Sequence, residues 1–274
     1  MGRRMAMLKK IALLLAAVML AAVPLCACSA KSQDTSQELP QLVIGYGEYR
    51  PYAYTNEDGY VAGLDVELAR EACERMGYKP VFKQIKWEYR DRYLKEGVVD
   101  CLWSCFSMDE REGDYDWAGP YMNSRQVVAV LEDSSIKGLS DLKDKRVGVK
   151  TSTRPEEIFL EHEDKRIPRV ENVYCLTDAE ELAAALRNGY ADAVAGHMGM
   201  LRYFLENTGT SYRLLDEDLA SALIGVAFAE DRDDSLCKEL DHALDDMRKD
   251  GTTASILKSH GVDASRALEG VGDE

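Results

Sequence analysis

The sequence is short of basic residues and of histidine, and it lacks the cysteine motif that is common in zinc sites. Its 34 Lys and Arg face 49 Asp and Glu, which gives a net charge of −15. Nucleic-acid binding relies on clustered Lys and Arg that contact phosphates, so this composition argues against it. With four His and no Cys-x-x-Cys, the chain has no signature of a structural zinc site. We therefore expect no nucleic-acid partner, no metal and no cofactor.

Cysteine is too sparse for a disulfide framework. Five cysteines follow Cys28, an odd number, and a chain of this length does not need cross-links to form a core. Cys101 and Cys105 lie in an apolar run that is typical of a buried strand. Four strand residues separate their Cα atoms by about 13 Å, whereas a disulfide needs about 4.4 to 6.8 Å. A disulfide between these two residues is not expected.

The N-terminal apolar run is too short to span a membrane comfortably. Ile11–Leu25 has 15 residues, and a transmembrane helix needs about 20. Because four basic residues precede it, the run is typical of a secretory signal peptide. It ends in Leu25-Cys26-Ala27-Cys28, which resembles the lipobox of bacterial lipoproteins. The resemblance implies cleavage after residue 27, lipidation of Cys28 and anchoring outside the cytoplasm on the bacterial cell membrane. There are two alternatives. The segment is an ordinary signal peptide in which Cys28 occurs by chance, or it remains in the protein as a membrane anchor.

Removal of residues 1–27 leaves 247 residues, enough for one large domain or two lobes. The removed segment contains four basic and no acidic residues, so the net charge of the remainder is −19. Anionic lipid head groups repel such an acidic chain. The lipid attached to Cys28, and not a basic surface, must then hold the protein at the membrane. Residues 28–40 are polar and lack apolar periodicity, which predicts a flexible tether.

Strand-like and helix-like segments alternate through the first half of the folded chain. A helix is predicted from an N-cap at Asp65 to Gly77, and another over Tyr89–Glu96. The predicted strands are Leu42–Ile44, Val81–Ile85 and Val98–Trp103. This βαβαβ order predicts a mostly parallel sheet with helices on both faces.

The second half repeats the pattern and ends in helices. Capping boxes at Thr153-x-x-Glu156 and Thr177-x-x-Glu180 predict two helix starts, and two further helices are predicted over Asp233–Lys249 and Thr252–Ser259. The predicted strands are Val127–Leu131, Arg146–Val149, Val173–Leu176, Ala191–Ala195 and Ala222–Ala229. Two α/β units indicate two lobes, with ligands expected at the carboxyl ends of the strands.

Short motifs in a fixed order resemble those of the solute-binding proteins of polar amino-acid ABC importers, which form family 3 of the bacterial extracellular solute-binding proteins. The motifs extend from Leu42 to Gly261 and comprise Pro51-Tyr52, Gly63–Ala69, Val99-Asp100, Ser107 with Arg111, Gly119–Tyr121, Leu142–Val149, Gly189–Ala193 and Met247–Thr252. The resemblance implies an α/β, two-lobed periplasmic-binding-protein fold of type II, with hinge strands near Val127–Leu131 and Ala222–Ala229. Lobe 1 would comprise 41–128 and 222–265, lobe 2 129–221, and the C-terminal tail 266–274.

Arg111 is the leading candidate for ligand binding, because the matching arginine of the family holds the ligand's carboxylate. A guanidinium is always charged and binds a planar carboxylate bidentately. An ion pair with Asp109, Glu110 or Asp114 on the same loop is the alternative.

The resemblance assigns further contacts to both lobes. Ser104, Cys105 and Ser107 match positions that bond polar ligand atoms, although strand-end turn chemistry is an alternative for the serines. Ser152 and Thr153 precede a predicted helix, whose free N–H groups attract carboxylates. The remaining matches are Tyr49 and Trp87, whose rings would sandwich the ligand side chain; the alternative is that they belong to the core. Glu48 is a weaker candidate for ligand binding.

His197 departs from the family, which carries at this position an Asp that accepts the α-ammonium of the ligand. Neutral imidazole accepts one hydrogen bond but supplies no negative charge. Either the α-amino group is held elsewhere, or the ligand is not a standard α-amino acid. A histidine that merely caps the next helix is the alternative.

We expect a monomeric binding protein without catalysis that captures a small carboxylate-bearing solute, an amino acid or a derivative, for an ABC permease. A module that senses ligand for a partner receptor is one alternative. An enzyme resembling the cyclohexadienyl dehydratases is another, with His197 or Glu48 as acid or base. No paired catalytic constellation is evident, which favours binding.

Overall fold

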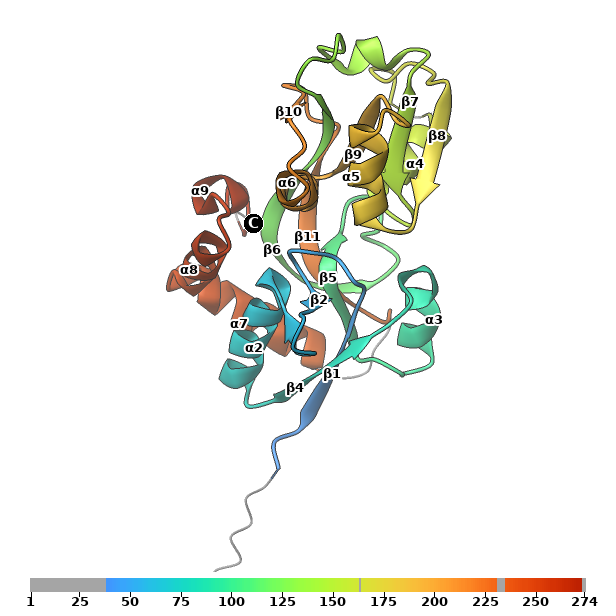
Figure 1. Ribbon diagram of the computed structural model, residues 1–274. Coiled ribbons are helices and arrows are strands. Elements are labelled where there is room, and N and C mark those ends of the chain that lie inside the picture. The colour runs from blue at the N-terminus through green and yellow to red at the C-terminus, as the bar shows by residue number, and fades with distance from the viewer. Residues whose placement is uncertain (1–37, 163, 231–234, 273–274) are drawn as a thin grey trace, which may run out of the picture. The chain divides into compact units, whose positions relative to one another are not determined.

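The computed structural model describes residues 38–162, 164–230 and 235–272, and Leu39–Glu274 forms one compact unit (Figure 1). The expected signal peptide and Cys28 lie outside the described residues, as does most of the expected tether and the start of the helix expected from Asp233. Among the described residues, no helix combines the length and the apolar character that a membrane crossing requires.

The first lobe is built on three parallel strands, β1 (Gln41–Tyr46), β4 (Lys79–Gln84) and β5 (Cys101–Ser107). Helix α2 (Leu64–Met76) and helix α3 (Arg90–Lys95), which follows a 3₁₀ turn at Trp87–Tyr89, connect these strands. The two helices pack on opposite faces of the sheet. The βαβαβ prediction is thus confirmed, and a small hairpin of β2 (Tyr54–Thr55) and β3 (Val61–Ala62) is inserted before α2.

The second lobe repeats this arrangement with the parallel strands β7 (Arg146–Lys150), β8 (Asn172–Leu176) and β9 (Ala193–His197). Helix α4 (Arg154–Glu161) packs on one face, and α5 (Ala179–Arg187) and α6 (Met198–Asn207) pack on the other. The short strand β10 (Tyr212–Leu214) is antiparallel to the end of β6.

Two long antiparallel strands, β6 (Asp116–Leu131) and β11 (Ala220–Phe228), connect the lobes. The strand order is β4-β1-β5-β11-β6-β9-β7-β8, so the sheet is parallel at both ends and antiparallel in the middle. Only the last five residues of β6 were predicted, because polar residues at 123–126 interrupt the apolar pattern earlier in the strand.

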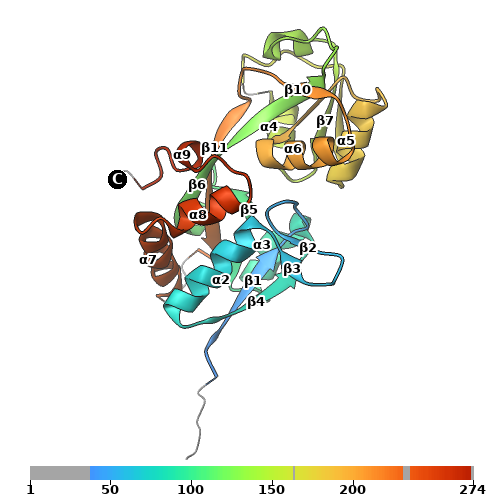
Figure 2. The same cartoon turned by 60° about the vertical axis from the view of Figure 1, so that its left-hand side comes forward.

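The chain returns to the first lobe at its C-terminus, where α7 (Leu236–Lys249) and α8 (Thr252–Ser259) pack beside α2 (Figure 2). Helix α9 (Ala264–Ala267) follows, and Val271 is buried. The segment expected as a C-terminal tail from residue 266 therefore begins inside a helix.

Three local predictions are wrong. Asp65 does not cap α2, because Gly63 is the N-cap and Asp65 lies in the buried first turn. Thr153 forms no capping box, since its hydroxyl donates to the carbonyl of Lys150. Asp178, not Thr177, caps α5 by accepting from the N–H of Glu180.

The third strand also begins later than predicted, at Cys101 rather than Val98. The N–H of Val98 still donates to the carbonyl of Tyr93 in the preceding helix, and Asp100 accepts from the N–H of Val43. These bonds keep residues 98–100 in the turn that leads into β5.

Gly63 begins α2 in a backbone conformation, φ of 123°, that side chains rarely adopt. A Cβ at this position would overlap the backbone of Tyr52, whereas a Cβ at Gly59, which also has a positive φ, meets no atom within 4 Å. We expect Gly63→Ala to destabilise the fold by about 3 kcal/mol or more and Gly59→Ala by about 1 kcal/mol, as measured by urea unfolding. Equal losses in the two variants would contradict this account of the turn.

Candidate functional site

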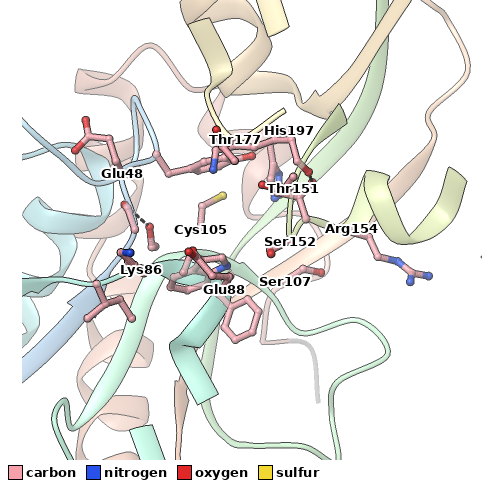
Figure 3. A pocket seen from close by; sticks show the side chains of 18 of the residues that line it. Glu48, Lys86, Glu88, Cys105, Ser107, Thr151, Ser152, Arg154, Thr177 and His197 are labelled. Carbon is pink, nitrogen blue, oxygen red and sulfur yellow. Dashed lines mark hydrogen bonds between the residues drawn. The ribbon is translucent and has the colours of Figure 1, made fainter. Parts of the chain in front are cut away.

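A cavity of about 480 Å³ lies at the carboxyl ends of the strands of both lobes (Figure 3). This volume is in the range of small-molecule sites. All nine residues that the sequence predicted as ligand-binding line it, namely Tyr49, Trp87, Ser104, Cys105, Ser107, Arg111, Ser152, Thr153 and His197. Residues from positions up to 148 apart in the chain are thus brought together around one space.

Several lining residues were not predicted from the sequence, among them Lys86, Glu88, Lys150, Thr151 and Arg154. Lys150 follows directly after the predicted strand Arg146–Val149. The same rule that placed Arg111 at a strand's carboxyl end could therefore have identified it.

The floor of the cavity is the carboxyl end of β5. The hydroxyl of Ser104 donates to the carbonyl of Gly47 in the loop after β1 (3.1 Å). The hydroxyl of Ser107 donates to the carboxylate of Asp109 (2.9 Å). Cys105 has a φ of 48°, which is uncommon for a residue other than glycine. The two hydroxyl protons are already used within the protein, so these serines offer a ligand their acceptor lone pairs.

Asp65 holds this floor from behind. Its carboxyl accepts hydrogen bonds from the N–H of Cys105 (2.6 Å) and from the hydroxyl of Tyr121 (2.9 Å), and the residue is 1% exposed. Burial raises the pKa of Asp65 to about 7, although the two hydrogen bonds act in the opposite direction. Asp65 does not line the cavity, and its role is to position the backbone of Cys105.

Arg111 follows β5 and is 11% exposed. Its guanidinium pairs with Glu157 of α4 and lies over the ring of Phe106, 5.6 Å from the centroid. The alternative that Arg111 pairs with an acid of its own loop is therefore wrong. The ion pair instead joins a residue of the first lobe to a residue of the second.

Arg154 extends this pair into a chain of four charges. It contacts Glu157 (3.3 Å) and also Glu110, the residue before Arg111, and is 13% exposed. Figure 3 shows its side chain directed away from Cys105 toward the edge of the cavity. Alternating charges from the loop after β5 and from α4 thus bridge the lobes beside the cavity. Arg111 retains further N–H donors that Glu157 does not use.

The loop between β7 and α4 forms the opposite wall. The N–H of Ser152, which was expected to face a ligand carboxylate, instead donates to Glu156 (2.6 Å). Ser152 has a φ of 57°, which turns the chain sharply after Thr151. Thr151 and Ser152 face Cys105 across the cavity in Figure 3.

The two predicted aromatic residues lie in different loops of the first lobe, Tyr49 after β1 and Trp87 after β4. Tyr49 stacks on Tyr52 with ring centroids 5.8 Å apart, and Trp87 packs edge-on against Phe106 at 5.1 Å. Glu48, the weaker candidate, points away from Cys105 in Figure 3. Its carboxylate contacts Arg50 (3.5 Å) and accepts from the N–H of Thr55 (3.2 Å), so its own loop engages it.

His197 ends β9 and is 4% exposed. Its Nδ1 lies 3.1 Å from the hydroxyl of Ser124 and its Nε2 lies 2.9 Å from the amide nitrogen of Gln126. Both ring nitrogens are therefore engaged by side chains of β6, one by a hydroxyl and the other by an amide. The alternative that the side chain caps α6 is wrong, because its two nitrogens bond to β6.

Burial lowers the pKa of His197 to about 4, so the ring is neutral at neutral pH. At residue 197 the cavity therefore offers neither an anion nor a free imidazole acceptor.

Comparisons with known proteins agree on the family and the fold. Residues 42–263 match the family described as bacterial extracellular solute-binding proteins, family 3. The chain is 27% identical to the probable amino-acid-binding protein YxeM of Bacillus subtilis, over 92% of this chain and 95% of the relative. It is 27% identical to the L-cystine-binding protein TcyJ of Escherichia coli, over 84% of this chain and 86% of the relative.

Among solved structures, Tv2483 bound to L-arginine superposes with a TM-score of 0.73 at 24% identity, covering 83% of this chain and 93% of that one. These relatives share the two-lobed periplasmic-binding fold, so the predicted fold class is confirmed.

The opposite pKa shifts of Asp65 and His197 predict opposing contributions to stability. Because its pKa is raised, Asp65 favours the fold most below about pH 3.8, and this contribution is lost progressively as the pH rises from there to about 7. The lowered pKa of His197 gives a contribution that is present above pH 6.5 and lost as the pH falls to about 4.

For each variant we compare its free energy of unfolding with that of the unsubstituted protein at the same pH. Between pH 4.5 and 6.5 this difference should become more unfavourable for His197→Gln and less unfavourable for Asp65→Asn as the pH rises. Each relative slope should reach at most about 1.4 kcal/mol per pH unit. Urea unfolding at three pH values measures these slopes. Parallel curves for the three proteins would show that neither group titrates as described.

Proposed function

This chain belongs to the bacterial extracellular solute-binding proteins, family 3, and we propose that it captures a small carboxylate-bearing solute, an amino acid or a derivative, for an ABC importer. The observation that carries the proposal is the cavity itself, whose walls come from both lobes and include Arg111. A ligand in this space contacts both lobes at once, so closure around it is favoured by contacts that the open form lacks.

The strand pairing supports a hinge between the lobes. Residues 123–125 of β6 pair with residues 221–223 of β11 and, in the described part of the chain, with no other strand. Val127–Leu131, expected as a hinge from sequence, pairs with β9 and β10 and so moves with the second lobe. We place the hinge a few residues earlier, where only two strands connect the lobes.

Arg111 is proposed to hold the ligand's carboxylate. The guanidinium lies at the cavity and is largely shielded from water, which strengthens a charge-assisted hydrogen bond. Glu157 already engages one of its nitrogens, so the ligand binds through the remaining donors or displaces that carboxylate. Ser152, Thr153, Ser104 and Ser107 supply the neighbouring polar contacts.

Binding without catalysis fits the titratable groups of the cleft. His197 has both ring nitrogens engaged by β6, and Glu48 is engaged by its own loop. These were the two candidates for acid or base in a dehydratase-like enzyme. The named relatives, an amino-acid-binding and a cystine-binding protein, also support solute binding.

We further propose that the protein works outside the cytoplasm, anchored by a lipid on Cys28, and delivers its ligand as a monomer to a membrane permease. The family is described as extracellular, and the lipobox-like sequence before Cys28 supports the anchor. The acidic composition favours an anchor of this kind over a basic membrane-binding surface.

Arg111→Ala should abolish ligand-induced stabilisation while the fold stays intact. A ligand at 100 times its dissociation constant stabilises the unsubstituted protein by about 2.7 kcal/mol, which a thermal-shift screen over amino acids, keto acids and short peptides detects. Arg92→Ala, at an exposed ion pair of α3, is the control and should retain the full shift. An unchanged ligand affinity in Arg111→Ala would remove Arg111 from the site.

Cys28→Ala should release the protein from the membrane fraction, because the acidic folded part has no other attachment in this proposal. Fractionation of expressing cells followed by immunoblotting measures the distribution. Retention of the variant in the membrane fraction would exclude the lipid anchor without affecting the binding proposal.

A further inference from the structure

Lys150 is a charged residue of the cavity to which the proposed function assigns no role. It ends β7 in the second lobe, is half-buried, and its Nζ lies 5.7 Å from the centroid of the Tyr49 ring. It forms no salt bridge with any residue that the structure describes.

The other charges that line the cavity are either paired within the protein or hydrated. Arg111 and Arg154 contact Glu157 and Glu110, and Glu48 contacts Arg50. Lys86 and Glu88 have opposite charges and are both exposed. A half-buried cation without a contacting carboxylate therefore remains only at Lys150 among the described lining residues.

Burial makes this environment unfavourable for the ammonium group, because the face of the Tyr49 ring replaces lost water with only a weak cation–π attraction. Burial lowers the pKa of Lys150, although Asp178 and Glu88 oppose this effect from a distance. An anion placed at Nζ would restore the interaction that the ammonium loses on leaving water.

The carboxylates that line the cavity, Glu48 and Glu88, are both exposed, and Glu48 is engaged by its own loop. His197 is neutral and has both nitrogens occupied, and the buried Asp65 lies behind Cys105 with its oxygens bonded to Cys105 and Tyr121. A second ammonium or guanidinium in the ligand would be repelled by Lys150, and the carboxylates left to pair with it in the described lining are the exposed ones of Glu48 and Glu88.

We propose that the ligand is a small dicarboxylate, with one carboxylate on Arg111 of the first lobe and the other on Lys150 of the second. The inference rests on the proposed function and narrows its substrate class. Since the two cations belong to different lobes, such a ligand would draw the lobes together by charge at both ends. Lys150 is then the residue that sets specificity for the second carboxylate.

The test compares L-glutamate, 2-oxoglutarate and L-glutamine by isothermal titration calorimetry at pH 7.5. Glutamate and glutamine differ in the second carboxylate, and 2-oxoglutarate keeps both carboxylates but has no ammonium. We expect the unsubstituted protein to bind at least one of the two dicarboxylates at least about tenfold more tightly than glutamine. The comparison between glutamate and 2-oxoglutarate shows whether an α-ammonium contributes.

Lys150→Met should lower the affinity for the preferred dicarboxylate at least about tenfold and lower any affinity for glutamine by a smaller factor, because the neutral amide makes no ion pair with the ammonium. Lys150→Arg, which keeps the charge, should retain most of the preference. Lys83→Met, the same substitution at an exposed residue of β4 outside the cavity, should change none of the affinities.

The outcomes separate this inference from the function on which it rests. Binding of neutral or basic amino acids in the thermal-shift screen, with no preference for dicarboxylates and no effect of Lys150→Met, would overturn the dicarboxylate inference and leave solute capture intact. If neither the screen nor calorimetry detected any ligand for the folded protein, both would be overturned.

Discussion

The buried carboxyl of Asp65 is the interaction on which the geometry of the cleft depends. It connects α2, which carries it, to the end of β5 through Cys105 and to the connecting strand β6 through Tyr121. A carboxyl removed from water is tolerated only when its oxygens are bonded, so these elements are constrained to meet at one point. The unusual backbone of Cys105 is maintained there because its N–H is satisfied by Asp65. Asp65 thus fixes the backbone at the floor of the cavity, although it does not itself line the cavity.

The second determinant is the chain of charges that bridges the lobes. Glu110, Arg154, Glu157 and Arg111 alternate in sign, and both arginines are largely shielded from water. Such pairs gain more from each other than exposed pairs do, but each ion also bears a desolvation cost. These ion pairs therefore add little net free energy to the closure of the lobes. Most of the free energy that favours closure then comes from the ligand in the cavity. A binding protein needs this balance, because a cleft that closed strongly by itself would not report its ligand.

Prediction from sequence succeeded where neighbouring residues determine the structure. It failed where a residue pairs with a partner that its local sequence pattern does not indicate. The helix that ends at Gly77 and the strand at Arg146 follow from glycine and from apolar periodicity, and both were identified. Thr153 has the spacing of a capping box, but its hydroxyl bonds to Lys150 instead. Most of β6 was missed because its polar middle is paired with β11, a strand about 100 residues away. For the site, family motifs selected nine residues that lie around one cavity, whereas Lys150, which no motif marked, was overlooked.

The sequence by itself determined the two α/β units, the family and the set of residues at the strand ends, because these depend on periodicity and on short motifs that survive without knowledge of contacts. Only the tertiary structure decided the partners of those residues. Arg111 pairs with Glu157, His197 is neutral between Ser124 and Gln126, and Lys150 is left without a contacting carboxylate among the described residues. Charge and protonation depend on burial and on neighbours brought together by the fold, and no linear pattern encodes either of them.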